Sequence, residues 1–180
     1  LVQTLEGNPA LIHGGPFANI AHGCNSIVAT KLGLSLANYV VTEAGFGSDL
    51  GCEKFIDIKC RYAGIKPSMI VLTTTVRALK YSGIDNLQAH IDNLNNYNIP
   101  FCVSINQFLE DKNEDIEEIK DYCLKQNIKC FVCDPFNKGG AGCIELAQYI
   151  LNYEYSDTKV NNIYKYFQVY LFYQLHCFQQ

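Results

Sequence analysis

A glycine-rich loop near the start of the chain carries the residues best suited to chemistry. It holds Gly14, Gly15, Phe17, Asn19 and His22. Glycine lets backbone N–H groups approach an anion closely, and a helix start offers further free N–H groups. Asn19 can orient a phosphate or carboxyl group, and His22 can donate a hydrogen bond or move a proton. In the alternative, structural interpretation, Asn19 caps a helix and His22 packs against neighbouring side chains. The sequence leaves the functional and the structural interpretation open.

A basic pair follows the strand-like run MIVLTTT in the middle of the chain. Arg77 and Lys80 come shortly after this run. A guanidinium can hold carboxylate or phosphate oxygens with two parallel hydrogen bonds, so Arg77 is a candidate for binding an anionic substrate. The alternative is that both side chains lie at the solvated start of a helix.

Aromatic rings also follow the strand-like runs. Flat ligands such as adenine or a pterin stack on such rings, although a single phenylalanine is more often part of a core. The glycines at 139 and 140 would give the last ring a flexible turn, so that it can close over a ligand. The candidate rings for nucleotide or folate binding are Phe17, Phe46, Phe108 and Phe136. Gly139 and Gly140, which follow the last ring, are candidates for the same site.

Other motifs are incomplete. The spacing of Gly45, Gly47 and Gly51 is one residue off the dinucleotide-binding fingerprint. No G-x-x-x-x-G-K-[ST] phosphate-binding loop occurs in the chain, so a protein that uses ATP through such a loop would carry it upstream. Cys130 and Cys133 form a lone C-x-x-C without a second pair or suitably spaced histidines, and no metal site is predicted.

Composition limits the partners and the compartment. The chain has 180 residues, of which 14 are basic and 18 acidic, and the net charge of −4 argues against nucleic acid as a partner. No apolar run approaches the ~20 residues that cross a bilayer, and the first residues do not resemble a secretory signal. The 9 cysteines are odd in number and irregularly spaced, which is typical of reduced thiols in a cytoplasmic protein. We expect no membrane partner.

Strand-like and helical patterns alternate along the chain. The β-type runs are residues 10–13, 39–42, 69–75, 101–105 and 129–133. Helical spacing covers residues 25–38, 48–63, 85–97, 113–126 and 143–151, with Asn113 expected to cap its helix. Five strand–helix units predict an α/β fold, with a mainly parallel sheet and helices on both faces. Such a sheet binds ligands beyond the carboxyl ends of its strands, which is where the candidate residues fall.

The sequence predicts one α/β segment over residues 1–150 and a tail of uncertain fold over residues 151–180. The tail has no glycine or proline and is crowded with tyrosine and phenylalanine. It could pack on another part of a longer protein, or be unrelated to the native fold.

The loops carry a family resemblance. The stretch GNPALIHGGPFANIAHGCNSIVATKLGLSLANYVVTEAGFGSDLGCEKFIDIKCRYAGIKPSMIVL resembles formate–tetrahydrofolate ligase (10-formyltetrahydrofolate synthetase). TTTVRALKYSG resembles that family's V-A-T-[VI]-R-A-L-K-x-[HN]-G-G signature, with its T-V-R-A-L-K core intact. NQFLED has Gln107 where arginine is usual, and FNKGGAGCIELA has Phe136 where tryptophan is usual. The resemblance covers about residues 4–150.

This resemblance implies a segment, roughly the middle third, of an ATP-dependent enzyme with an incomplete, doubly wound architecture like that of P-loop NTPases. Formate and ATP, the latter with magnesium, would give formyl phosphate, whose formyl group passes to tetrahydrofolate. The loop from Gly14 to His22 would lie on the nucleotide or formyl-phosphate side, and Phe108 and residues 136–142 on the adenine or folate side. A homo-oligomer is expected for the full-length enzyme. The alternative is a noncatalytic α/β module that binds nucleotide or folate.

Overall fold

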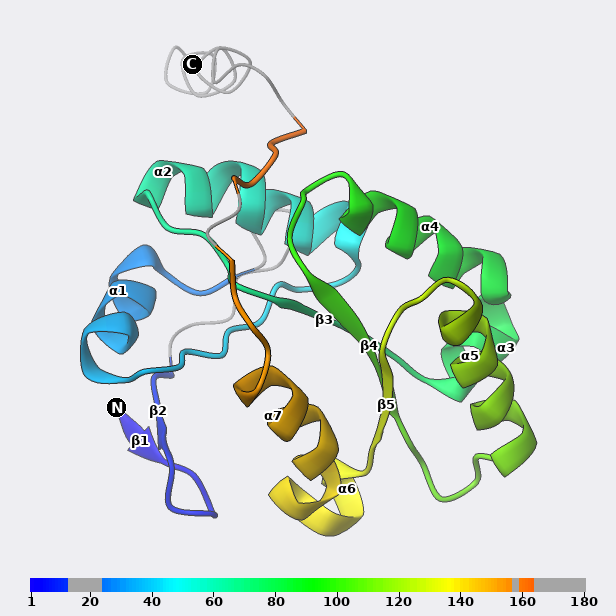
Figure 1. Ribbon diagram of the computed structural model, residues 1–180. Helices are drawn as coiled ribbons and strands as arrows, with labels where there is room; N and C mark the ends of the chain where they lie inside the picture. The colour runs from blue at the N-terminus through cyan, green and yellow to red at the C-terminus, as the bar shows by residue number, and fades with distance from the viewer. Residues whose placement is uncertain (13–23, 157–158, 164–180) are drawn as a thin grey trace, which may run out of the picture.

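The computed structural model describes residues 1–12, 24–156 and 159–163. Its centre is a three-stranded parallel sheet in the order β3-β4-β5 (Figure 1). The strands are β3 (Ile70–Thr74), β4 (Phe101–Asn106) and β5 (Cys130–Cys133). Ile70 pairs with Phe101, and Val103 with Cys130. The carboxyl ends of all three strands therefore meet at one edge of the sheet.

Helices make the crossovers that parallel strands require. Two helices, α3 (Val76–Ser82) and α4 (Ile84–Asn95), join β3 to β4, and α5 (Asn113–Lys125) joins β4 to β5. The Thr75 hydroxyl caps α3 by accepting a hydrogen bond from the Ala78 N–H at 3.0 Å. This cap fixes where the strand ends and the helix begins, and so where Arg77 lies.

The remaining helices flank this unit. Residues 48–63 form one helix with π-helical turns η1 (Ser48–Cys52) and η2 (Phe55–Cys60), ending in α2 (Arg61–Ala63). The others are α1 (Ile27–Leu36), α6 (Pro135–Lys138), the 3-10 helix η3 (Gly139–Cys143) and α7 (Ile144–Leu151). No helix in the described part of the chain has the length and apolar character that a membrane crossing requires.

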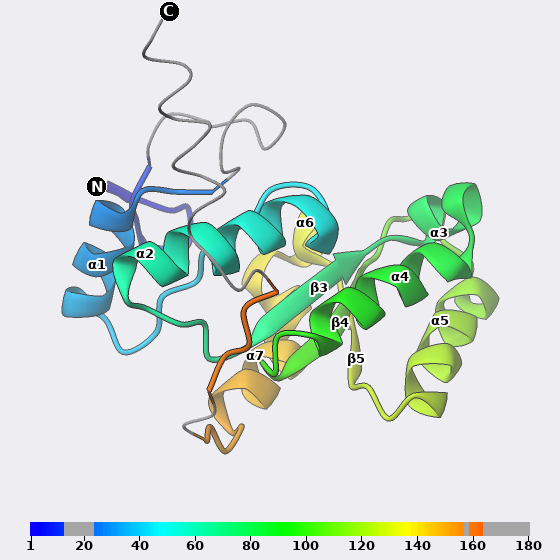
Figure 2. The ribbon, with the colours of Figure 1, turned by 90° about the horizontal axis from the view of Figure 1, so that it is seen from above.

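Helices cover both faces of the sheet. On one face, Val103 and Ile105 of β4 are fully buried against Leu87, Ile91 and Ile116 of α4 and α5. On the other face, the Phe131 ring of β5 packs against Tyr149 of α7 in a tilted arrangement, with ring centres 5.0 Å apart. Figures 1 and 2 both show α4 and α5 on one side of the strands and α7 on the other. The predicted α/β class with flanking helices is confirmed, and the sheet is consistent with an incomplete P-loop-like fold.

A second buried cluster holds the helix of residues 48–63 in place. Phe55 and Ile56 of this helix pack with Leu94, Tyr97 and Ile99, just before β4. The Tyr97 hydroxyl, fully buried, donates a hydrogen bond to Asp57 Oδ2 at 3.4 Å. Burial and the neighbouring Asp57 raise the pKa of Tyr97, so its hydroxyl stays protonated.

Two of the five predicted strands are wrong. Residues 39–42 form no strand. Of residues 10–12 only Ala10 belongs to one, in the antiparallel hairpin of β1 (Val2–Gln3) and β2 (Pro9–Ala10), and residue 13 lies outside the described residues. Branched residues favour strands, but a strand also needs a neighbour to pair with. The described parallel sheet ends at β3 on this side.

The predicted cap of α5 is also wrong. Lys112 occupies the N-cap position without a side-chain hydrogen bond, and Asn113 is the first helical residue.

Candidate functional site

The ends of β3 and β4 bring two predicted site residues together. Arg77 lies in the first turn of α3, and its guanidinium carbon is 5.8 Å from the centre of the Phe108 ring. The Phe108 N–H donates to Asp111 Oδ2 at 2.8 Å, which holds the loop that presents the half-buried ring. A cation at this distance is attracted by the ring's electrons. A positive group and an aromatic face therefore lie side by side at the carboxyl edge.

The two basic residues after β3 have different surroundings. Lys80 Nζ forms an ion pair with Asp115 Oδ2 at 2.5 Å, which ties α3 to α5. Arg77 is exposed and has no ion pair within the described residues. Arg77 is therefore the better placed of the two for an external anion.

Asn106, the last residue of β4, falls on the predicted carboxyl edge but was not among the candidate site residues. Its Oδ1 is buried and finds no hydrogen-bond partner in the described part of the chain. Buried polar atoms normally have a hydrogen-bond partner, so an acceptor without one is a candidate ligand-binding atom. The signal in the sequence is a polar residue directly after the apolar run FCVSI, at the end of the central strand.

Phe136 lies in the short helix after β5. Asp134 Oδ1 accepts a hydrogen bond from the Asn137 N–H at 3.3 Å, and Pro135 opens the helix. The Phe136 side chain is 84% exposed. The ring is thus outside the core, at the same edge as Phe108, rather than packed under the last helix.

The glycine turn after Phe136 holds a carboxylate. The Gly140 N–H donates to Glu6 Oε1 at 2.7 Å, and a Cβ on Gly139 would lie only 2.5 Å from the same oxygen. Glu6 belongs to the turn between β1 and β2. The two glycines let the backbone approach this carboxylate of the chain closely. Their role in nucleotide or folate binding stays a prediction.

The G-x-G-x-x-x-G segment is a self-packed turn. A Cβ on Gly51 would overlap the Gly45 carbonyl oxygen, so the third glycine serves chain packing. Between them Phe46 has φ of 64° and is 71% exposed. A left-handed conformation is costly for an aromatic residue, so this turn stores backbone strain at Phe46, itself one of the candidate stacking rings.

The C-x-x-C cysteines do not share a site. A hydrogen bond with Cys123 of α5, together with burial, raises the pKa of Cys130, whereas burial and the neighbouring Cys133 raise the pKa of Cys143. Among the described residues no three metal-ligating side chains come together. Burial raises the pKa of Cys102 to about 11, which keeps this thiol protonated and unreactive.

Half of the predicted site residues lie outside the described part of the chain: Gly14, Gly15, Phe17, Asn19 and His22. Their place at the carboxyl edge stays a prediction.

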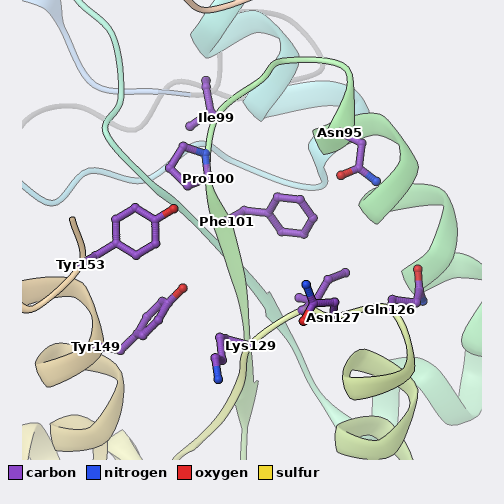
Figure 3. A pocket seen from close by; sticks show the side chains of 10 residues that line it. Asn95, Ile99, Pro100, Phe101, Gln126, Asn127, Lys129, Tyr149 and Tyr153 are labelled. Atoms are coloured by element: carbon purple, nitrogen blue, oxygen red, sulfur yellow. The ribbon is translucent and has the colours of Figure 1, made fainter. Parts of the chain in front are cut away.

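A cavity of about 350 Å³ opens at the opposite edge of the sheet (Figure 3). Phe101 and Lys129, at the amino ends of β4 and β5, line it together with Tyr149 and Tyr153. Because none of the predicted residues contributes to it, this cavity does not bear on the carboxyl-edge site.

Comparison with known proteins decides the family. The family profile "Formate--tetrahydrofolate ligase" matches residues 1–169. The chain belongs to the formate–tetrahydrofolate ligase family. The match therefore covers the described sheet, the glycine-rich loop of residues 14–23 and the start of the aromatic tail.

A curated member of the ligase family gives the scale of the whole protein. The formate–tetrahydrofolate ligase of Campylobacter concisus (strain 13826) is 50% identical over 184 aligned residues, which cover 92% of this chain. The same alignment covers 34% of that ligase, so the chain spans about a third of its relative's length.

Proposed function

We propose that this chain supplies part of the active site of an ATP-dependent ligase that joins formate to tetrahydrofolate. The observation that carries the proposal is the pairing of Arg77 with the Phe108 ring at the carboxyl edge. At the same edge, the last residue of β4, Asn106, has a buried oxygen without a hydrogen-bond partner among the described residues. A cation, an aromatic face and a buried acceptor suit a flat ligand that also carries negative charge. ATP and tetrahydrofolate both fit this description.

In the proposed reaction a formate oxygen attacks the γ-phosphorus of ATP, and ADP leaves. The product, formyl phosphate, is a mixed anhydride that must be shielded from water. The N10 amine of tetrahydrofolate then attacks the formyl carbon, the C–O bond to phosphate breaks, and the amine proton leaves as 10-formyltetrahydrofolate forms. Positive and N–H groups that stabilise the phosphate charge would accelerate both steps.

Each residue has a proposed role in this scheme. Arg77 holds a substrate anion, and Phe108 and Phe136 form stacking faces for adenine or the pterin. Asn19 and His22, with Gly14, Gly15 and Phe17, handle the phosphoryl group. ATP would bring its magnesium ion with it. Cytoplasmic location and assembly into a homo-oligomer are part of the same proposal.

The proposal predicts that the isolated 180-residue chain is inactive, because the sequence lacks the lysine of a P-loop, which would hold the β- and γ-phosphates. Formation of 10-formyltetrahydrofolate should be measured with ATP and formate, for the chain alone and for the protein extended by the reading frame on both sides. Activity of the extended protein alone supports the proposal, and activity of the 180-residue chain would contradict the inactivity prediction. An inactive extended protein that still binds ATP or tetrahydrofolate would favour the noncatalytic binding module.

A further inference from the structure

Lys59 is a buried cation in the middle of the helix of residues 48–63. Its residue exposure is 4%. The ammonium donates hydrogen bonds to Thr30 Oγ1 at 2.9 Å and to Asn25 Oδ1, and lies 4.5 Å from the centre of the Phe55 ring. Burial lowers the pKa of Lys59. Removing an ammonium from water is costly, and its neutral oxygen partners offset this desolvation cost only in part. A methionine at this position would bring no such cost.

The contact with Asn25 decides how that amide is oriented. A lysine ammonium can only donate, so the atom of Asn25 that faces it must be the oxygen. The Asn25 nitrogen then points the other way and donates to Thr42 Oγ1 at 2.5 Å. Thr30 Oγ1 also donates to Asn25 Oδ1, at 3.0 Å, but a hydroxyl can donate or accept, so Lys59 is the partner that fixes which end of the amide faces it.

This network links two stretches of the chain. The Asn25 amide is hydrogen-bonded to Thr42, and the neighbouring Cys24 and Ala44 form an antiparallel bridge between the same stretches. In the sequence, Asn25 follows the glycine-rich segment of residues 14–23, and Thr42 precedes the strained turn of residues 45–51. Lys59 therefore supports, through Asn25, the contact between residues 24–25 and 42–44.

We propose that Lys59 is a positioning residue that holds residues 24–25 and 42–44 together through Asn25 and Thr42. It acts through its partners and does not itself touch a substrate. The proposal rests on the ligase function proposed above, because only then does the spacing of these two stretches affect a rate.

The first test uses the 180-residue chain. Lys59→Met keeps the length of the side chain and removes the donors, and Lys31→Met, at an exposed lysine beside Thr30, is the control. Hydrogen exchange should become about tenfold faster in residues 24–30 and 40–45 of Lys59→Met, and stay unchanged in α5. Faster exchange confined to residues 48–63, or no change, overturns the proposal.

The second test uses the extended ligase. Lys59→Met should lower kcat by about tenfold per folded enzyme, and Lys59→Arg should restore part of it. Thr42→Val removes only the hydroxyl that accepts the Asn25 hydrogen bond, and it should lower kcat by about threefold. This variant keeps the test available even if Lys59→Met fails to fold. A purely structural role would lower the melting temperature and leave kcat of the folded variants unchanged, which overturns the proposal. If the unmodified extended protein is inactive, the proposed ligase function is wrong. The hydrogen-exchange experiment still decides whether Lys59 couples residues 24–30 to residues 40–45.

Discussion

Replacing Phe136 by alanine should separate ligand binding from stability. The ring is 84% exposed, so it contributes about a sixth of the ~1.5–3 kcal/mol that a fully buried phenylalanine gives, or about 0.3–0.5 kcal/mol. For a domain of this size that loss lowers the melting temperature by about 1–2 °C. If the ring stacks on adenine or the pterin, the same change removes about 1–2 kcal/mol of aromatic contact and raises one Michaelis constant by about 5- to 30-fold.

The assay compares both quantities in matched variants. Thermal unfolding is measured on the 180-residue chain, and the Michaelis constants for ATP and tetrahydrofolate on the extended ligase. Phe136→Trp should be tolerated and keep the Michaelis constants near their original values. Phe131→Ala is the control, because that ring packs 5.0 Å from Tyr149 and its loss should cost about 2–3 kcal/mol of stability.

The reasoning is refuted if Phe136→Ala lowers the melting temperature by more than about 5 °C while both Michaelis constants stay the same. That result would mean that the ring packs against protein in the native state, and the stacking role would have to be abandoned.

Three further predictions concern other parts of the structure. Arg77→Ala should weaken binding of an anionic substrate by about 1–3 kcal/mol. Lys80→Ala, which breaks the exposed ion pair with Asp115, should change substrate affinity and stability by less than about 1 kcal/mol. Equal effects of the two variants on the Michaelis constants would contradict the anion-binding role of Arg77. Gly51→Ala should destabilise the chain by at least about 2 kcal/mol in urea unfolding, because the methyl group meets the Gly45 carbonyl; a near-neutral variant would show that this turn is looser than described. The pKa of Cys102 is raised by burial from 9.0 to about 11, so its contribution to stability is complete below pH 9 and is lost as the pH rises from about 9 to 11. Cys102→Ala should flatten this part of the plot of unfolding free energy against pH, and an equally steep fall in that variant would assign the effect to other groups.

Much of the fold follows from patterns local in the sequence. The apolar runs of β3, β4 and β5 are bounded by helices with regular spacing, and their alternation is enough to predict a parallel sheet. The same order places Arg77, Phe108 and Phe136 at one edge, because every residue directly after a parallel strand emerges there. The family, too, could be recognised from contiguous motifs.

Other features depend on contacts between distant segments. Residues 39–42 have the composition of a strand, yet the described sheet ends at β3, and no local pattern reveals whether a pairing edge is available. The Glu6 carboxylate on the Gly140 N–H joins residues 134 positions apart. The burial of Lys59 depends on Thr30 of α1 and on Asn25, which precedes that helix. The sequence by itself determined the elements and the edge to which the candidate residues belong. Only the tertiary structure decided which charges are buried and which glycines meet a carboxylate, because these properties arise from packing between segments that the chain order keeps apart.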